Sequence, residues 1–206
     1  MGLFVKICGL TRLRDVEEVV ECGPDAIGFV FWSGSPRCVD PEEVGHWTRH
    51  LRRKVLRVGV FVDASRDEIM RAVRVAGLDI VQLHGQESPD FCRGLPFKRW
   101  KALHLDRAQG QVWREYQVDA FLADSYSAAM PGGTGRTADW DRVRRFVKEA
   151  APTPVILAGG LTPENVREAV RRVRPWGVDV SSGVEVSPGR KDIGKVREFI
   201  RQCRAL

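Results

Sequence analysis

The chain has 206 residues, of which 43% are hydrophobic and 29% are charged, the composition of an ordinary globular protein. No apolar run approaches the roughly 18 residues that are needed to cross a membrane. The net charge of +6 is spread along the sequence without interleaved aromatic residues, which argues against a nucleic-acid-binding protein and suits a small anionic substrate.

Short apolar segments that end in small or polar residues predict eight β-strands. These segments are residues 4–8, 25–31, 55–62, 79–85, 98–103, 119–124, 154–158 and 177–183. Helical patterns lie between them at residues 15–22, 41–51, 65–76, 107–116, 139–150, 162–173 and 192–203, with a short helix opening at Ser88-Pro89. Start signals include Asp40 before Pro41 and the capping box of Ser65 and Glu68.

Strict alternation of strands and helices predicts a parallel sheet. Eight such units match the (β/α)₈ TIM barrel, and at 206 residues the connecting loops must be short. We therefore expect one catalytic barrel domain over residues 1–206. The alternative is an open, doubly wound sheet.

The termini and cysteines give further expectations about location and metals. The N-terminus lacks the pattern of a secretory signal peptide, which predicts a cytoplasmic protein. The five cysteines have neither disulfide-framework nor zinc-site spacing. His46 and His50 are four apart on an expected helix, but no HExxH pattern or third ligand accompanies them, so we expect no metal.

Polar residues occupy the inward-facing positions at several strand ends. Because side chains alternate along a strand, the apolar Val5 and Ile7 should face the helices, and Lys6 and Cys8 the barrel interior. The same alternation turns further polar side chains inward: Gln82, His84, Asp124, Asp179 and Ser181. Catalytic groups of TIM barrels lie at these carboxyl ends, so we expect the active site there.

Glycine-rich turns follow the last two expected strands, at residues 157–161 and 181–185. Barrel enzymes often bind phosphate between these two loops and a short extra helix, where backbone N–H groups approach the anion. A third glycine-rich stretch, residues 131–135, follows the sixth strand and is weaker evidence on its own.

Seven motifs follow one another along essentially the whole chain: Lys6-Ile7-Cys8-Gly9-Leu10-Thr11, Ser35-Pro36-Arg37, Gln82-Leu83-His84-Gly85, Gly132-Gly133-Thr134-Gly135, Ala158-Gly159-Gly160-Leu161, Asp179-Val180-Ser181-Ser182-Gly183-Val184-Glu185 and Pro188-Gly189-Arg190-Lys191-Asp192. In this order they resemble the phosphoribosylanthranilate isomerase family of tryptophan biosynthesis. The loop at residues 124–130 is less typical of the family.

The resemblance implies an Amadori rearrangement of N-(5-phosphoribosyl)anthranilate to 1-(2-carboxyphenylamino)-1-deoxyribulose 5-phosphate, without a cofactor. It places the general acid on Asp124 and the general base on Cys8. Lys6, one layer below Cys8, is a candidate to favour the thiolate. The related isomerase of histidine biosynthesis runs the same rearrangement. That family is expected to carry a pair of aspartates at these strand ends, and Cys8 argues against it.

The remaining site residues are expected to bind the substrate. Arg37 should pair with the anthranilate carboxylate, for which a planar guanidinium is well suited, and Gln82 and His84 line the same mouth. Asp179 either contacts a ribose hydroxyl or pairs with Lys6. The phosphate is expected at the backbone of Gly160, Ser181, Ser182 and Gly183. The partner is thus a small phosphorylated substrate, with no nucleic acid or membrane, and the protein is a monomer or a homodimer.

Overall fold

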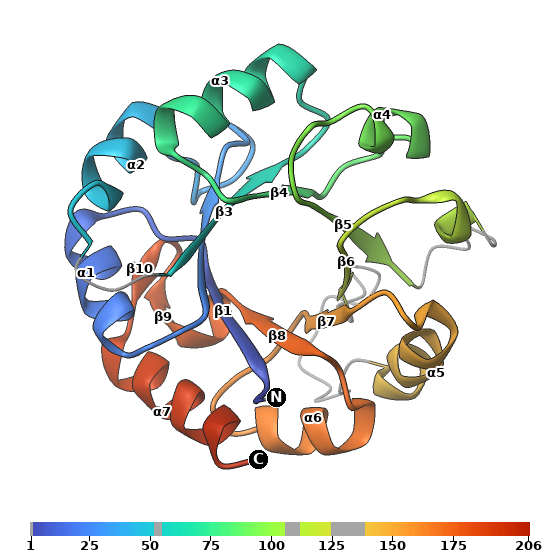
Figure 1. Ribbon diagram of the computed structural model, residues 1–206. Helices are drawn as coiled ribbons and strands as arrows, with labels where there is room; N and C mark the ends of the chain where they lie inside the picture. The colour runs from blue at the N-terminus through green and yellow to red at the C-terminus, as the bar shows by residue number, and fades with distance from the viewer. Residues whose placement is uncertain (1, 52–54, 106–111, 125–138) are drawn as a thin grey trace.

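A ring of parallel strands surrounded by helices forms the protein (Figure 1). The computed structural model describes residues 2–51, 55–105, 112–124 and 139–206. The strands close into a barrel in the order β1-β2-β3-β4-β5-β6-β7-β8. They are β1 (Phe4–Cys8), β2 (Ala26–Val30), β3 (Leu56–Phe61), β4 (Ile80–Leu83), β5 (Arg99–His104), β6 (Ala120–Asp124), β7 (Val155–Ala158) and β8 (Gly177–Val180).

A helix follows each strand, as the alternating pattern predicts. The helices are α1 (Leu13–Glu21), α2 (Pro41–Thr48), α3 (Arg66–Ala76), α4 (Pro89–Arg93), the 3₁₀ helix η1 (Val112–Glu115), α5 (Trp140–Ala150), α6 (Val166–Val173) and α7 (Ile193–Arg204). The prediction of a (β/α)₈ barrel with short loops is confirmed, and the doubly wound alternative is wrong because β1 pairs with β8 and closes the sheet.

The predicted boundaries differ from the observed ones mainly at helix ends. The capping box of Ser65 and Glu68 is present and starts α3. The helix expected from residue 162 becomes regular only at Val166, because the Asn165 side chain accepts from the backbone N–H of Thr162 and organises a turn there. Of the helix expected at 107–116, residues 107–111 lie outside the described part of the chain.

The alternation of side chains sorts the core into two parts. Val5 and Ile7 belong to the large apolar layer between the strands and the helices. Side chains of a smaller apolar cluster point into the barrel: Ala26, Val58, Ile80, Trp100, Ala102, Ala120, Leu122, Ile156 and Ala158, with Phe4 packed against them. Lys6 and Cys8 therefore face inward, as predicted, above an apolar floor.

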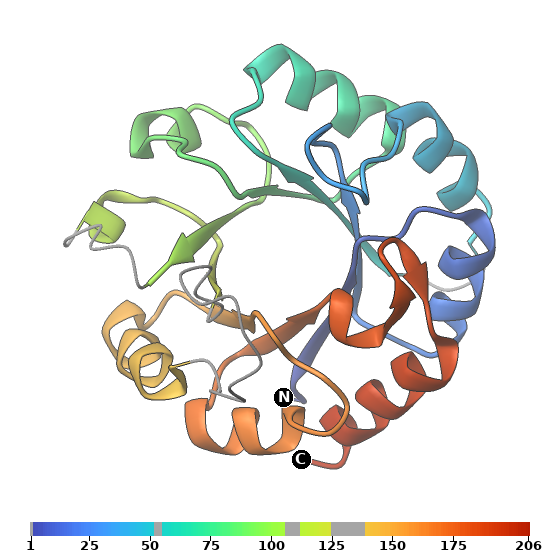
Figure 2. The same ribbon diagram turned by 180° about the vertical axis from the view of Figure 1, so that it is seen from behind.

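The connection between β8 and α7 contains structure that the sequence did not predict. It holds the 3₁₀ helix η2 (Ser182–Val184) and a small antiparallel hairpin of β9 (Glu185–Ser187) and β10 (Arg190–Lys191). Figure 2 shows this hairpin beside α7 and the start of α1. The hairpin places two charged residues, Glu185 and Lys191, beside the end of β1, where they bear on the site described below.

The two chain ends lie close together (Figure 1). Arg204 of α7 donates to the carbonyl of Leu3 at 2.6 Å and pairs with Asp25 at 2.8 Å, so the last helix is fastened to the first strand. None of the helices in the described ranges is long and apolar enough to cross a membrane.

Two glycines should respond to alanine with opposite signs. Gly77 ends α3 at φ +63°, so Gly77→Ala should lower the free energy of unfolding by about 1 kcal/mol. Gly194 lies inside α7, where an added Cβ would meet only the Asp192 carboxylate at 3.2 Å, and Gly194→Ala should be neutral or stabilising by up to ~1 kcal/mol. Urea denaturation measures both, and equal losses would contradict this account.

Candidate active site

Cys8 is the last residue of β1 and is 7% exposed at the carboxyl end of the barrel. Its neighbour across the sheet is Gly28 of β2. A Cβ on Gly28 would lie 2.7 Å from the Cys8 sulfur and 3.0 Å from Cε of Lys6. The missing side chain at Gly28 therefore makes the space that Cys8 and Lys6 occupy.

Lys6 lies one layer deeper and has no exposed surface. Its ammonium donates to Oδ2 of Asp179 and to Oε1 of Gln82, both at 2.9 Å. Asp179 thus pairs with Lys6, which was one of two predicted roles. Its second oxygen, Oδ1, is buried and has no hydrogen-bond partner among the described residues, so it is available to a substrate hydroxyl.

Burial and nearby charge act in opposite directions on the pKa values of Lys6 and Cys8. Burial lowers the pKa of Lys6, but the attraction of Asp179 and Cys8 outweighs it and the pKa is raised overall. Burial raises the pKa of the Cys8 thiol, and the opposing attraction of Lys6 does not cancel it. Lys6 favours the thiolate as predicted, yet the free protein holds Cys8 mainly as the thiol.

On the other side of the mouth, β4 brings Gln82 and His84 inward. Nε2 of Gln82 lies 3.1 Å from Nδ1 of His84, so Gln82 links Lys6 to the imidazole. Burial, with further effects from His104, Lys6 and Lys101, lowers the pKa of His84 to about 4 in spite of the attraction of Asp124. His84 is therefore neutral near pH 7.

Asp124 ends β6 and is paired in register with His104, the last residue of β5. Its Oδ2 lies 4.0 Å from Nε2 of His84, and its side chain is 20% exposed. A partly buried carboxyl at a strand end is a suitable proton donor when a substrate covers it. The predicted acid is thus beside one of the predicted substrate-binding residues.

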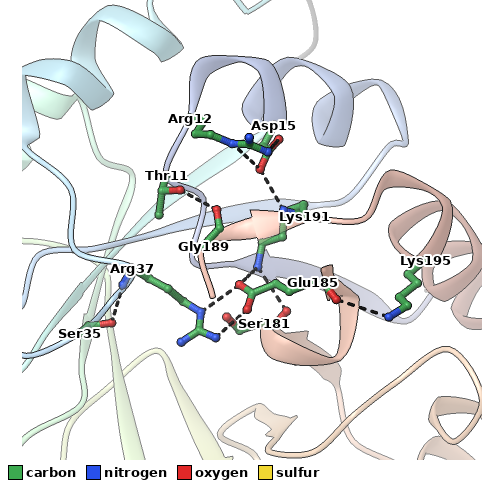
Figure 3. Close-up of polar contacts among 10 residues, drawn as sticks. All are labelled: Thr11, Arg12, Asp15, Ser35, Arg37, Ser181, Glu185, Gly189, Lys191 and Lys195. Atoms are coloured by element: carbon green, nitrogen blue, oxygen red, sulfur yellow. Dashed lines mark hydrogen bonds and ion pairs between the residues drawn. The ribbon is translucent and has the colours of Figure 1, made fainter. Parts of the chain in front are cut away.

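Arg37, from the loop after β2, makes a two-pronged ion pair with Glu185 (Figure 3). Its Nε and Nη2 donate to the two carboxylate oxygens at 2.9 and 2.6 Å. Lys191 approaches the same carboxylate at 2.8 Å and also donates to the carbonyl of Ser181. Burial raises the pKa of Glu185, but the hydrogen bonds from Arg37 and Lys191 prevail and lower it.

The loop after β1 and the start of α1 are hydrogen-bonded to the β9–β10 hairpin (Figure 3). The Thr11 hydroxyl donates to the carbonyl of Gly189 at 2.6 Å, and the backbone N–H of Lys191 donates to Asp15 at 2.9 Å. Gly9, at φ +77°, lets Arg37 pass over the end of β1, because a Cβ there would lie 2.6 Å from Cδ of Arg37. The Arg37 side chain thus crosses the end of β1 to reach Glu185.

The glycine turn after β7, where the sequence predicts part of a phosphate site, has a backbone that favours glycine. Gly159 and Gly160 have φ values of +87° and +65°. Asn165 bridges the turn: its side chain accepts from the N–H of Thr162 and donates to the carbonyl of Gly160 at 2.9 Å. These two hydrogen bonds fix the shape of the turn.

The second phosphate-loop candidate, after β8, packs directly against the first. A Cβ on Gly183 would overlap the carbonyl oxygen of Leu161, so only glycine allows η2 to lie this close to the β7 loop. The first hydrogen bond of η2 is donated by Val184 to Ser181. The N–H groups of Ser182 and Gly183 precede it and have no acceptor within the turn.

Sequence reasoning missed several residues of this region. Glu185 and Lys191 belong to recognised motifs, but nothing in their spacing predicts that their side chains form an ion pair. His104 could have been found, because it is a polar residue at a strand end. The stretch at residues 131–135 lies outside the described residues. Within the described ranges, no group of three or more His, Cys, Asp or Glu side chains is placed to hold a metal ion.

Comparison with known proteins gives one family. Residues 5–202 match the family described as N-(5'phosphoribosyl)anthranilate (PRA) isomerase. An N-(5'-phosphoribosyl)anthranilate isomerase of Pelobacter propionicus is 47% identical over 198 residues, which cover 96% of this chain and 93% of that protein. The phosphoribosyl anthranilate isomerase of Thermotoga maritima superposes with a TM-score of 0.88 at 38% identity, covering 99% of this chain and 100% of that chain.

One similar structure contains a ligand. It is a phosphoribosyl anthranilate isomerase in complex with reduced 1-(o-carboxyphenylamino)-1-deoxyribulose 5-phosphate. It superposes with a TM-score of 0.84 at 36% identity, and the match covers 99% of this chain and 100% of that chain.

The alkylation of Cys8 should report its raised pKa. The rate of reaction with iodoacetamide, followed by mass spectrometry of the Cys8 peptide, should rise with pH to a midpoint above that of a free cysteine, because burial disfavours the thiolate. Lys6→Met should move the midpoint higher still, since the favourable charge is lost. A midpoint below that of free cysteine in the unmodified protein would contradict this assignment.

Proposed function

The chain belongs to the N-(5'-phosphoribosyl)anthranilate isomerase family, and we propose that it converts phosphoribosylanthranilate to the aminodeoxyribulose phosphate with Cys8 as base and Asp124 as acid. It is an isomerase of tryptophan biosynthesis. The observation that carries the residue assignment is the inward position of these two proton-carrying side chains at the carboxyl ends of β1 and β6.

The reaction needs two proton transfers. Asp124 gives its proton to the furanose ring oxygen while the bond from C1′ to that oxygen breaks, and the nitrogen lone pair forms the C=N bond of a Schiff base. The small fraction of Cys8 present as the thiolate, which Lys6 favours, then removes the proton from C2′, and that electron pair forms the C1′–C2′ double bond of an enolamine as the iminium nitrogen is neutralised. Tautomerisation of the enolamine gives the ketone.

The charges of the mouth suit a substrate with a carboxylate and a phosphate. Glu185 occupies Nε and Nη2 of Arg37, which leaves Nη1 for the anthranilate carboxylate. The backbone of Gly160 and of Ser181–Gly183 is proposed to hold the phosphate. Gln82 and His84 line the ribose side, and Oδ1 of Asp179 accepts from a ribose hydroxyl.

We propose that the chain works as one barrel domain in the cytoplasm, as a monomer or a homodimer. Monomers of a dimeric isomerase from Thermotoga maritima have been crystallised, which makes both states reasonable for this fold.

Loss of phosphoribosylanthranilate fluorescence tests the reaction and the two catalytic residues. The unmodified protein should consume freshly made substrate, and no loss at micromolar protein would refute the function. Cys8→Ser and Asp124→Asn should each lower kcat by roughly 100- to 10,000-fold, the usual range for removal of a general acid or base. Cys22→Ser, at the outer end of α1, is the matched control and should retain turnover. Near-normal turnover in Cys8→Ser would remove the base assignment, and in Asp124→Asn the acid assignment.

Arg37→Ala should mainly raise KM, because it removes an interaction that substrate and transition state share. Arg37→Lys should recover part of the loss, since it keeps the charge but not the planar fork. Arg14→Ala, a change of an exposed arginine on α1, should leave KM unchanged. An unaltered KM in Arg37→Ala would show that this residue does not bind the carboxylate.

A further inference from the structure

A row of polar groups runs across the barrel mouth from Lys6 to Asp124. The Lys6 ammonium donates to Oε1 of Gln82 at 2.9 Å, Nε2 of Gln82 lies 3.1 Å from Nδ1 of His84, and Nε2 of His84 lies 4.0 Å from Oδ2 of Asp124. Lys6 and Gln82 are fully or almost fully buried. The two middle members of this row, Gln82 and His84, are neutral near pH 7.

The hydrogen bond from Lys6 to Gln82 determines how Gln82 meets His84. An ammonium has donors only, so the Gln82 group that faces Lys6 must be the amide oxygen. The amide NH₂ of Gln82 is then turned towards His84 and donates to Nδ1. Nδ1 of His84 is therefore an acceptor and carries no proton.

The state of His84 follows from its surroundings. The charged and titratable groups that act on it are Asp124, which favours protonation, and His104, Lys6 and Lys101, which oppose it. Burial is the largest effect and lowers the pKa of His84 to about 4. A neutral imidazole has one N–H, and since Nδ1 accepts from Gln82, the proton is on Nε2, the nitrogen that faces Asp124.

We propose that Lys6 and Gln82 are positioning residues that hold His84 as the Nε2–H tautomer, and that His84 donates a hydrogen bond to Asp124 as this carboxyl releases its proton. The inference rests on the proposed role of Asp124 as the acid. At 4.0 Å the contact is too long for a hydrogen bond in the free protein. Such contacts commonly shorten only when the substrate is bound.

The tautomer matters because charge appears on Asp124 only during ring opening. A neutral N–H aimed at the carboxylate stabilises that developing charge. A charged imidazolium would instead hold Asp124 as the carboxylate before the reaction and deprive it of the proton it must donate. The other neutral tautomer would turn a lone pair towards Asp124 and oppose the same step.

Nitrogen NMR of the free, ¹⁵N-labelled protein tests the tautomer without reference to turnover. Long-range ¹H–¹⁵N spectra distinguish protonated from unprotonated ring nitrogens, and His84→Asn identifies the His84 signals among those of the four histidines. We expect Nε2 protonated and Nδ1 unprotonated at pH 7. In Gln82→Glu both side-chain oxygens accept, so Nδ1 should become protonated. A protonated Nδ1 in the unmodified protein, or no change in Gln82→Glu, would overturn the proposal.

Two substitutions of His84 distinguish the loss of its hydrogen-bond donor from the loss of the volume of its ring. The amide NH₂ of glutamine reaches the place of Nε2, whereas that of asparagine reaches only the place of Nδ1. His84→Asn should lower kcat by about 100-fold with little change in KM, as expected for a donor that acts in the transition state. His84→Gln should restore at least a tenth of the unmodified kcat. His46→Asn, on the exposed side of α2, is the matched control.

The outcomes separate this inference from the proposed function. An unmodified protein that does not consume phosphoribosylanthranilate refutes the function, whereas the spectra still report the tautomer. An active protein in which His84→Asn and His84→Gln have equal kcat values overturns the proposed donation to Asp124. A raised KM with an unchanged kcat in His84→Asn would make His84 a substrate-binding residue alone and would also overturn it.

Discussion

The buried ion pair of Lys6 and Asp179 is the interaction on which the rest of the mouth depends. Taking each charge out of water costs several kcal/mol, and only close, well-oriented partners offset this cost. Lys6 has such partners in Asp179 and Gln82, both at 2.9 Å. Along β1, Phe4 packs with the apolar interior, Lys6 forms the charged middle layer, and Cys8 reaches the mouth. The ion pair thus marks the boundary between a dry barrel floor and a polar site.

A second charged group, Glu185, orders the side of the mouth that carries Arg37, where the substrate carboxylate is proposed to bind. It is buried between two cations, Arg37 and Lys191, and its lowered pKa keeps it ionised. Its ionised carboxylate fixes the Arg37 guanidinium before any substrate arrives, so less side-chain entropy is lost on binding. Two cations around one carboxylate also leave this part of the mouth with a positive balance, which suits an anionic ligand.

The sequence predicted what depends on local periodicity. Alternation along β1 and β4 was enough to turn Lys6, Cys8 and Gln82 inward, because neighbours on one strand fix the facing of each side chain. Pairs distant in the sequence could not be predicted: Arg37 and Glu185 are 148 positions apart, and their meeting depends on the β9–β10 hairpin. The burial that raises the pKa of Cys8 likewise depends on how the whole mouth closes, which periodicity does not describe.

The two proposed catalytic groups need opposite electrostatic environments. A cation beside a thiol promotes its ionisation, as Lys6 does for Cys8, but the same cation beside Asp124 would remove the proton that the proposed acid has to donate. The neutral amide of Gln82 and the neutral imidazole of His84 lie between Lys6 and Asp124. In the proposed arrangement they convey to Asp124 the orientation that the ammonium imposes. One buried lysine then acts on the proposed base through its charge and on the proposed acid through the direction of a hydrogen bond.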